Sequence, residues 1–257
     1  MIDPIFKYLF LITLATVFLI SCTAEGQPDH TKSPNSVQQE KQLLVFSKTN
    51  GWRHESIEAG QQAITLLGEQ NDVGVTLTEN SSMFHPDTLA SYSAVIFLNT
   101  TETILNDDQR AAFENYIQNG GGFVGIHAAA DTEYDWPWYG ELVGAYFDNH
   151  PPGTPNADVL LQDSSHPATT MLPEIWNKDD EWYNYQGFSD QINVLLTLDT
   201  QSYEGSNHPG NHPIAWYHEF DGGRSFYTGL GHTKASYKDD LFLQHLWGGI
   251  TYAISEQ

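Results

Sequence analysis

Three histidines, His54, His127 and His232, each follow a run of apolar residues in the sequence. Imidazole changes its protonation near neutral pH and serves as a general base or as a metal ligand. If the apolar runs are parallel strands of one sheet, ligands bind beyond their carboxyl ends. We therefore expect the three imidazoles to point toward one crevice, with His127 and His232 within about 10 Å of each other.

His127 lies in the sequence Gly125-Ile126-His127-Ala128-Ala129, which has the spacing of a nucleophile elbow. In such an elbow, small flanking residues permit a sharp turn after a strand and expose the middle side chain. The alternative is a buried His that only caps a helix or forms a structural hydrogen bond. The small neighbours favour a functional role, in which His127 is a base, a metal ligand or a nucleophile.

Other polar and aromatic residues complete a candidate site. We predict catalytic roles for His127, His232 and Glu181, and contacts with a substrate for Trp52, Arg53, His54, Asp131, Trp182 and Tyr183. A divalent metal such as Zn²⁺ is a further possibility, because several imidazoles and a carboxylate suit such an ion. Its predicted ligands are His54, His127, His150 and His232, which match no compact local signature.

The elements that would position these residues alternate between strands and helices. Strands are predicted at 43–46, 73–77, 94–98, 123–126, 192–198, 213–220 and 224–230, and helices at 56–70, 106–117 and 239–254. Asn106 and Gln109 have the spacing of a capping box at a helix start. This alternation predicts an α/β fold with a mostly parallel sheet and helices on both faces.

Several motifs, in this order, resemble those of the ThuA-like (trehalose-utilisation) proteins. They are Lys48 to Ile57, Gly120 to His127, His150-Pro151, His166-Pro167, Asp180 to Tyr183, Pro213 to Tyr217 and Gly223 to Thr233. The resemblance implies the three-layer sandwich of class I glutamine amidotransferases, a flavodoxin-like arrangement. It also implies a sugar ligand, because the family is associated with the catabolism of trehalose and related sugars.

The same resemblance argues against glutamine hydrolysis. In glutamine amidotransferases the elbow holds a Cys, whereas this sequence has His127 there, and its only cysteine is Cys22. No Ser occupies the elbow either, so neither glutamine hydrolysis nor a Ser-His hydrolase is supported. Two hypotheses remain: an enzyme, either a hydrolase or a lyase, acting on a sugar or sugar derivative in carbohydrate catabolism, and a non-catalytic protein that binds carbohydrate in the same crevice.

The N-terminus predicts export. The apolar run from Tyr8 to Ile20 is shorter than the ~20 residues that cross a bilayer, and fits a signal peptide instead. Leu19-Ile20-Ser21-Cys22 resembles the bacterial lipobox, in which the Cys is lipidated. We expect a signal peptide at 1–21, a polar tether at 22–40 and one domain at 41–257, held at the periplasmic or outer-membrane face by the lipid alone.

The net charge limits the partners of this chain. Ten Lys and Arg stand against 33 Asp and Glu, giving a formal net charge of −23 at pH 7. Nucleic acid is bound by clustered Lys and Arg, so an acidic surface excludes this class of partner. A small carbohydrate is the partner that we expect.

Overall fold

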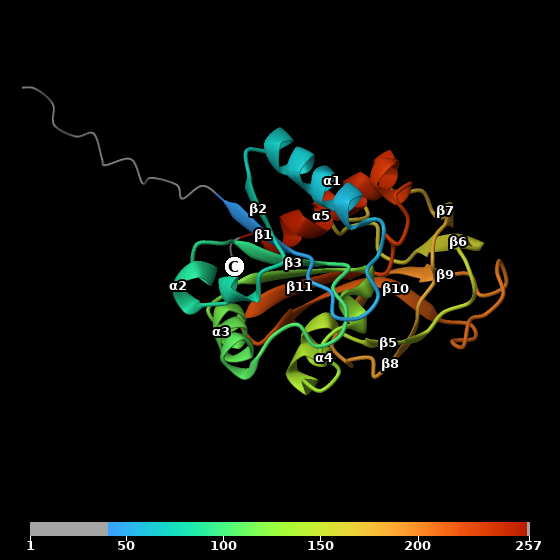
Figure 1. The fold of residues 1–257 in the computed structure, drawn as a ribbon. Coiled ribbons are helices and arrows are strands. Elements are labelled where there is room, and N and C mark those ends of the chain that lie inside the picture. Colours follow the sequence, from blue (N-terminus) through green and yellow to red (C-terminus); the bar gives the residue numbers. More distant parts are fainter. Residues whose placement is uncertain (1–40, 256–257) are drawn as a thin grey trace, which may run out of the picture. The chain divides into compact units, whose positions relative to one another are not determined.

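The computed structural model describes residues 41–255 (Figure 1). The predicted signal peptide, the tether and Cys22 lie outside the described residues. Within residues 41–255, no helix is both long enough and apolar enough to span a membrane.

One nine-stranded sheet forms the centre of the fold, in the order β2-β1-β3-β4-β11-β10-β9-β6-β7. Five neighbouring strands are parallel: β2 (Gly74–Thr78), β1 (Gln42–Phe46), β3 (Ala94–Leu98), β4 (Gly122–Ile126) and β11 (Gly223–Thr228). The remaining neighbours are antiparallel: β10 (His212–Phe220), β9 (Asn193–Leu198), β6 (Asn156–Leu161) and β7 (Ile175–Asp179). A separate pair joins β5 (Tyr146–Asn149) to β8 (Asn184–Gln186).

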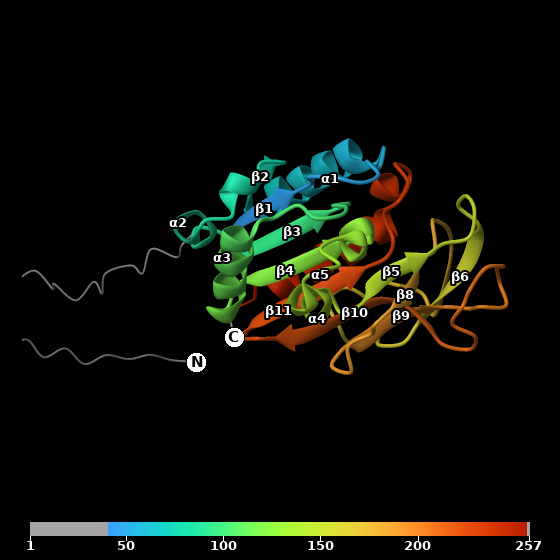
Figure 2. The same ribbon diagram turned by 60° about the horizontal axis from the view of Figure 1, so that its bottom comes forward.

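Helices cover both faces of this sheet. Figures 1 and 2 show α1 (Ile57–Gln70) and α5 (Asp240–Ala253) on one face, and α3 (Asp107–Gln118) and α4 (Pro137–Val143) on the other. The short α2 (Pro86–Leu89) packs against α3, and single 3₁₀ turns lie at η1 (Ser81–Met83), η2 (His127–Asp131) and η3 (Ser236–Lys238). Every residue of β3 and β4 is buried, as expected for strands covered on both sides.

The predicted α/β sandwich is confirmed, and its sheet is mixed rather than parallel throughout. The helix start at Asn106 is also confirmed: its side chain accepts from the amide of Gln109, whose side chain accepts from the amide of Asn106 in return. Strands β5 to β8 were not among the predicted elements. They lie between α4 and β9 in the sequence. β6 and β7 extend the antiparallel part of the large sheet, and β5 and β8 form the separate pair.

The strand directions decide where the site lies. β10 runs opposite to β11, and each further step to β9, β6 and β7 reverses the direction again. After four reversals β7 runs the same way as β11, so its carboxyl end lies at the same edge of the sheet as those of β1, β4 and β11. The residues that follow these four strands are therefore brought to one edge.

Candidate metal and sugar site

Four side chains converge at this edge, and we call them the His/Glu cluster: His54, His127, Glu181 and His232. One possible ligand atom from each lies within 4.8 Å of the others. His54 comes from the loop after β1, His127 follows β4, Glu181 follows β7, and His232 follows β11. The ring centroids of His127 and His232 are 5.2 Å apart, which confirms that the two predicted residues lie within about 10 Å of each other at this edge of the sheet.

His127 occupies the sharp turn that the sequence predicts. Its φ is +48°, in the left-handed region that a residue with a side chain seldom adopts, and the 3₁₀ turn η2 starts at this residue. A Cβ added at Gly125 would lie 3.0 Å from Tyr227 and 3.2 Å from Ala129, so a side chain at this position would be tightly packed. The Tyr227 hydroxyl donates to the backbone carbonyl of His127 at 2.8 Å, and this hydrogen bond holds the turn in place.

The hydrogen bonds of His127 define which of its nitrogens bears the proton. Nδ1 lies 2.8 Å from the carbonyl oxygen of Gly229, which can only accept, so Nδ1 is the donor. In neutral His127 the lone pair of Nε2 then faces Oε2 of Glu181 at 3.2 Å. His232 Nδ1 lies 3.3 Å from the same Nε2 and 3.0 Å from Oε2, so its N–H reaches both acceptors. A His that donates one ring N–H to a backbone carbonyl keeps the lone pair of its other nitrogen for a metal ion, as metal-ligating histidines do.

His54 adds a ring nitrogen, Nδ1, that has no hydrogen-bond partner among the described residues. Its side chain is buried. Its ring stands edge-on to those of His127 and His232, with centroids 5.0 and 5.1 Å away. Burial, together with the neighbouring His127 and His232, lowers the pKa of His54 to about 2. His54 is therefore neutral at ordinary pH and keeps a lone pair for a metal ion.

Glu181 is the centre of the hydrogen bonds in the cluster. His232 Nδ1 donates to Oε2 at 3.0 Å, and His150 Nδ1 lies 3.3 Å from Oε1. Burial raises the pKa of Glu181, but the hydrogen bond from His232 and the charges that His127 and His232 can carry lower it by more, so the carboxylate stays ionised. Burial alone would lower the pKa of His232. The hydrogen bond with Glu181 and the negative charge of that carboxylate outweigh this effect and raise the pKa of His232 above its ordinary value.

The cluster opens into a cavity of about 470 Å³. Its polar wall consists of the cluster residues His54, Glu181 and His232 with His150 and Asp131, and its apolar wall of Trp52, Phe147 and Tyr183. The Trp52 side chain is 72% exposed at this site. The Tyr134 hydroxyl donates to one oxygen of Asp131 at 2.6 Å, and burial raises the pKa of Asp131. The cavity thus combines aromatic surfaces with ionisable groups.

Not every predicted site residue lines this cavity. His127, although part of the cluster, is fully buried and does not belong to the lining. Arg53 forms ion pairs with Glu58 at 2.7 Å and Glu79 at 2.9 Å, and it does not belong to the lining. Trp182 is fully buried and donates to the carbonyl of Pro155 instead. His150 does line the cavity, but it contacts the oxygen of Glu181 that faces away from the cluster, so Glu181 joins the three other histidines in its place.

Two residues at the site were missed. Phe147 lies on the unpredicted strand β5 and lines the cavity. Asp180 is fully buried and binds backbone amides of the loop that holds His232. Its place in the motif from Asp180 to Tyr183 was a signal in the sequence, but its partners in the loop after β11 are about fifty positions away.

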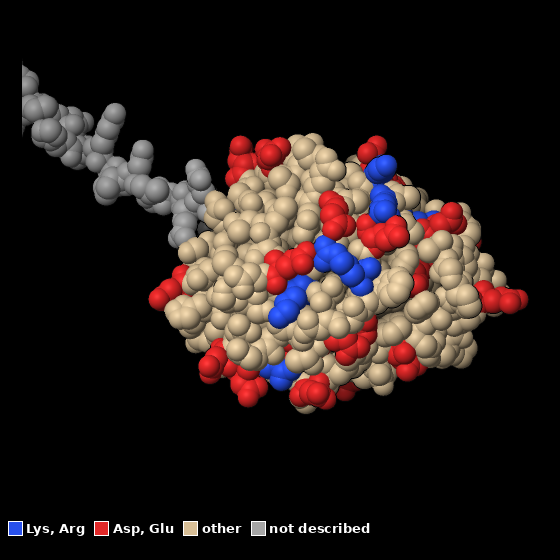
Figure 3. All heavy atoms as spheres, viewed as in Figure 1, with Lys and Arg blue, Asp and Glu red and all other residues tan. Residues whose placement is uncertain are grey.

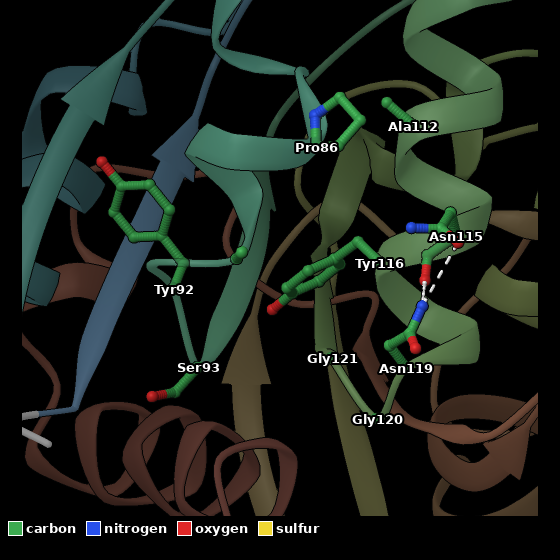
Figure 4. A pocket seen from close by; sticks show the side chains of 10 residues that line it. Pro86, Tyr92, Ser93, Ala112, Asn115, Tyr116, Asn119, Gly120 and Gly121 are labelled. Atoms are coloured by element: carbon green, nitrogen blue, oxygen red, sulfur yellow. Dashed lines mark hydrogen bonds between the residues drawn. The ribbon is translucent and has the colours of Figure 1, made fainter.

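A second cavity, of about 340 Å³, lies at the opposite edge of the sheet (Figure 4). Its lining includes Ser93 and Gly121, just before β3 and β4, and Asn115, Tyr116 and Asn119 from α3 and its end. Figure 4 shows the side chains of Asn115 and Asn119 bonded to each other rather than directed at a ligand. The lining holds no His, Asp, Glu, Lys or Arg, so the cavity beside the His/Glu cluster is the better candidate for catalysis.

Lys and Arg are few on the face drawn in Figure 3, and each basic group lies beside acidic ones. The ion pairs of Arg53 and that between Lys234 and Glu55 are of this kind. These exposed pairs mostly neutralise local charge and contribute little to stability.

Comparisons with known proteins agree with this architecture. A family model described as "ThuA: Trehalose utilisation" matches residues 42–253. No curated protein matches the chain in sequence. A ThuA-like protein from Bacteroides uniformis superimposes with a TM-score of 0.73 at 22% identity, covering 90% of this chain and 97% of its own. A ThuA-like protein from Parabacteroides merdae gives a TM-score of 0.65 at 20% identity, with coverages of 83% and 90%.

A more distant likeness involves a much longer enzyme. A β-galactosidase from Bacillus circulans sp. alkalophilus has a TM-score of 0.55 at 14% identity, covering 83% of this chain and 31% of the enzyme. At such identities the solved structures show a shared fold.

Proposed function

Because the chain belongs to the trehalose-utilisation (ThuA) family, we propose that it is an enzyme that acts on a sugar or sugar derivative and that the His/Glu cluster binds a divalent metal ion. The observation that most supports the metal is the Nε2 of His127 facing the Glu181 carboxylate while its Nδ1 donates to Gly229. Three imidazoles and one carboxylate suit Zn²⁺ or a similar ion. When bound, such an ion supplies Lewis-acid chemistry and an acidified water.

The rest of the cavity supports a sugar substrate. The exposed indole of Trp52 and the rings of Phe147 and Tyr183 offer flat apolar surfaces against which a sugar ring can pack. Asp131 keeps one carboxylate oxygen beyond that bonded to Tyr134, so it can accept from a sugar hydroxyl. The Tyr183 ring also packs on His127 at 4.1 Å, which places the apolar wall next to the cluster.

The experiment tests metal binding and sugar conversion on the same protein preparation. Purified protein, stripped with a chelator, is reloaded with Zn²⁺, Ni²⁺, Co²⁺ or Mn²⁺ and incubated with disaccharides and their keto derivatives. We expect one metal to raise the melting temperature by mass action and to restore product formation from at least one sugar. Chelated protein should be inactive, and the Trp52→Ala variant should keep the metal but bind the sugar more weakly.

The outcomes separate the two hypotheses. Sugar binding without product from any compound would favour the carbohydrate-binding alternative. Full activity of the chelated protein would contradict the metal-dependent proposal.

We also propose that the chain is anchored in the cell envelope through Cys22, on the basis of Leu19-Ile20-Ser21-Cys22. Thioether formation needs the thiol, so Cys22→Ser should abolish incorporation of a labelled fatty acid. The measurement is metabolic labelling of cells that express either form. Equal labelling of the wild type and the Cys22→Ser variant would contradict the lipoprotein hypothesis.

A further inference from the structure

The side-chain carboxylate of Asp180 accepts hydrogen bonds from the backbone of two members of the His/Glu cluster, Glu181 and His232. Its Oδ1 accepts from the amides of Glu181 at 3.0 Å and His232 at 3.1 Å. Its Oδ2 accepts from the amide of Gly231 and the hydroxyl of Ser236, both at 2.9 Å. The carboxylate is fully buried, and each of its two oxygens accepts two donors.

Three of these four bonds, those with Gly231, His232 and Ser236, join two loops that are far apart in the sequence. Glu181 follows β7, whereas Gly231, His232 and Ser236 follow β11. The loop after β11 bends at Gly231, whose φ is +111°, and this bend turns two successive amides toward Asp180. A carboxylate that accepts from backbone amides forms charge-assisted hydrogen bonds, the stronger kind.

The polar contacts continue to the other two cluster residues. The carbonyl of Gly231 accepts from Ser56 Oγ at 3.1 Å and from Asn99 Nδ2 at 3.4 Å. Ser56 lies two residues after His54, and Asn99 Oδ1 accepts from the amide of Ala128, next to His127. Ser56, Asn99 and Asp180 are all fully buried. This connected network reaches the loop of every member of the His/Glu cluster.

We propose that Asp180 is a positioning residue, whose carboxylate sets the separation of Glu181 and His232 so that the cluster binds a divalent ion. The inference rests on the proposed metal site. A neutral amide at this position would turn an NH₂ group toward two donors, and the two loops would lose their common acceptor. Groups that hydrogen-bond to the residues around a metal ligand, without touching the metal, typically change metal affinity about 10–100-fold.

The test measures Zn²⁺ affinity by competition with a chromophoric chelator, and the stability of the metal-free protein by urea. Asp180→Asn is expected to weaken Zn²⁺ binding about 10–100-fold. Glu133→Gln is the matched control, because Glu133 is also fully buried and accepts from the amides of Ile104 and Leu105, away from the cluster. The control should lose stability and keep Zn²⁺ affinity.

Ser236→Ala provides a milder variant, since it removes a single donor from Asp180. It should fold and show a smaller loss of Zn²⁺ affinity in the same direction. Wild-type affinity in both Asp180→Asn and Ser236→Ala would refute the role of Asp180 and leave the metal site intact. Failure of the wild type to bind Zn²⁺, Co²⁺ or Ni²⁺ would refute the metal site and this inference together.

Discussion

Glu181→Gln is expected to reduce Zn²⁺ affinity by more than about 100-fold, which exceeds the usual effect of removing a group that only supports a metal ligand. Glu181 supplies the single carboxylate of the His/Glu cluster, and its Oε2 faces both His127 and His232. Gln keeps the size of the side chain but removes the negative charge that offsets a divalent ion. On a substrate that the wild type converts, turnover should fall about 10²–10⁴-fold, as for removal of a direct acid–base group.

The measurement is a Zn²⁺ titration and a steady-state assay on the same preparations. Glu58→Gln is the control, because Glu58 is exposed and pairs only with Arg53 outside the cavity. It should behave as the wild type in both assays. An unchanged Zn²⁺ affinity of Glu181→Gln would remove this carboxylate from the metal site.

Trp216→Ala is expected to lower the free energy of unfolding by about 3–5 kcal/mol. Trp216 is fully buried on β10, its indole N–H donates to the carbonyl of Val143 at 2.8 Å, and its ring stacks on Tyr227 at 4.5 Å. Such a loss is a large part of the 5–15 kcal/mol that holds a typical domain folded. Because Tyr227 fixes the turn at His127, the loss of packing should also loosen the site.

Trp52→Ala is the matched control, since the same residue type is removed from the surface instead of the core. Its stability should stay within about 0.5 kcal/mol of the wild type. Guanidinium denaturation followed by circular dichroism compares the two variants. A loss below about 1 kcal/mol for Trp216→Ala would mean that the surrounding aromatic rings close the gap.

The convergence of three cluster histidines could be predicted because it depends on a general property of parallel sheets. Each polar residue after a buried strand lies at the same edge as its counterparts, so His127 and His232 could be assigned to one crevice without knowing the strand order. The small residues around His127 predicted the sharp turn that the structure shows there. The capping box at Asn106 could also be predicted, because it involves only two residues three positions apart, Asn106 and Gln109.

Other parts of the site depend on contacts that no local pattern encodes. Strands β5, β7 and β8 contain many polar residues, so no apolar run indicates them. Strand β6 ends in the apolar run from Val159 to Leu161, which could have been recognised in the sequence and was not. Trp52, Arg53 and His54 are consecutive, and only tertiary packing decides that Arg53 turns toward Glu58 and Glu79 while the other two face the cavity. The amide contacts of Asp180 span about fifty residues and require the finished fold.

The cluster draws its residues from two parts of the architecture. Its three imidazoles follow strands of the parallel half, whereas Glu181 and the cavity residues Phe147, His150 and Tyr183 belong to the stretch around β5 to β8. A gene that exchanged this stretch would retain the three imidazoles and replace the carboxylate and much of the apolar wall of the cavity. Under the proposed function, substrate preference and the charge at the metal would then diverge among paralogues while the nitrogen donors stayed the same.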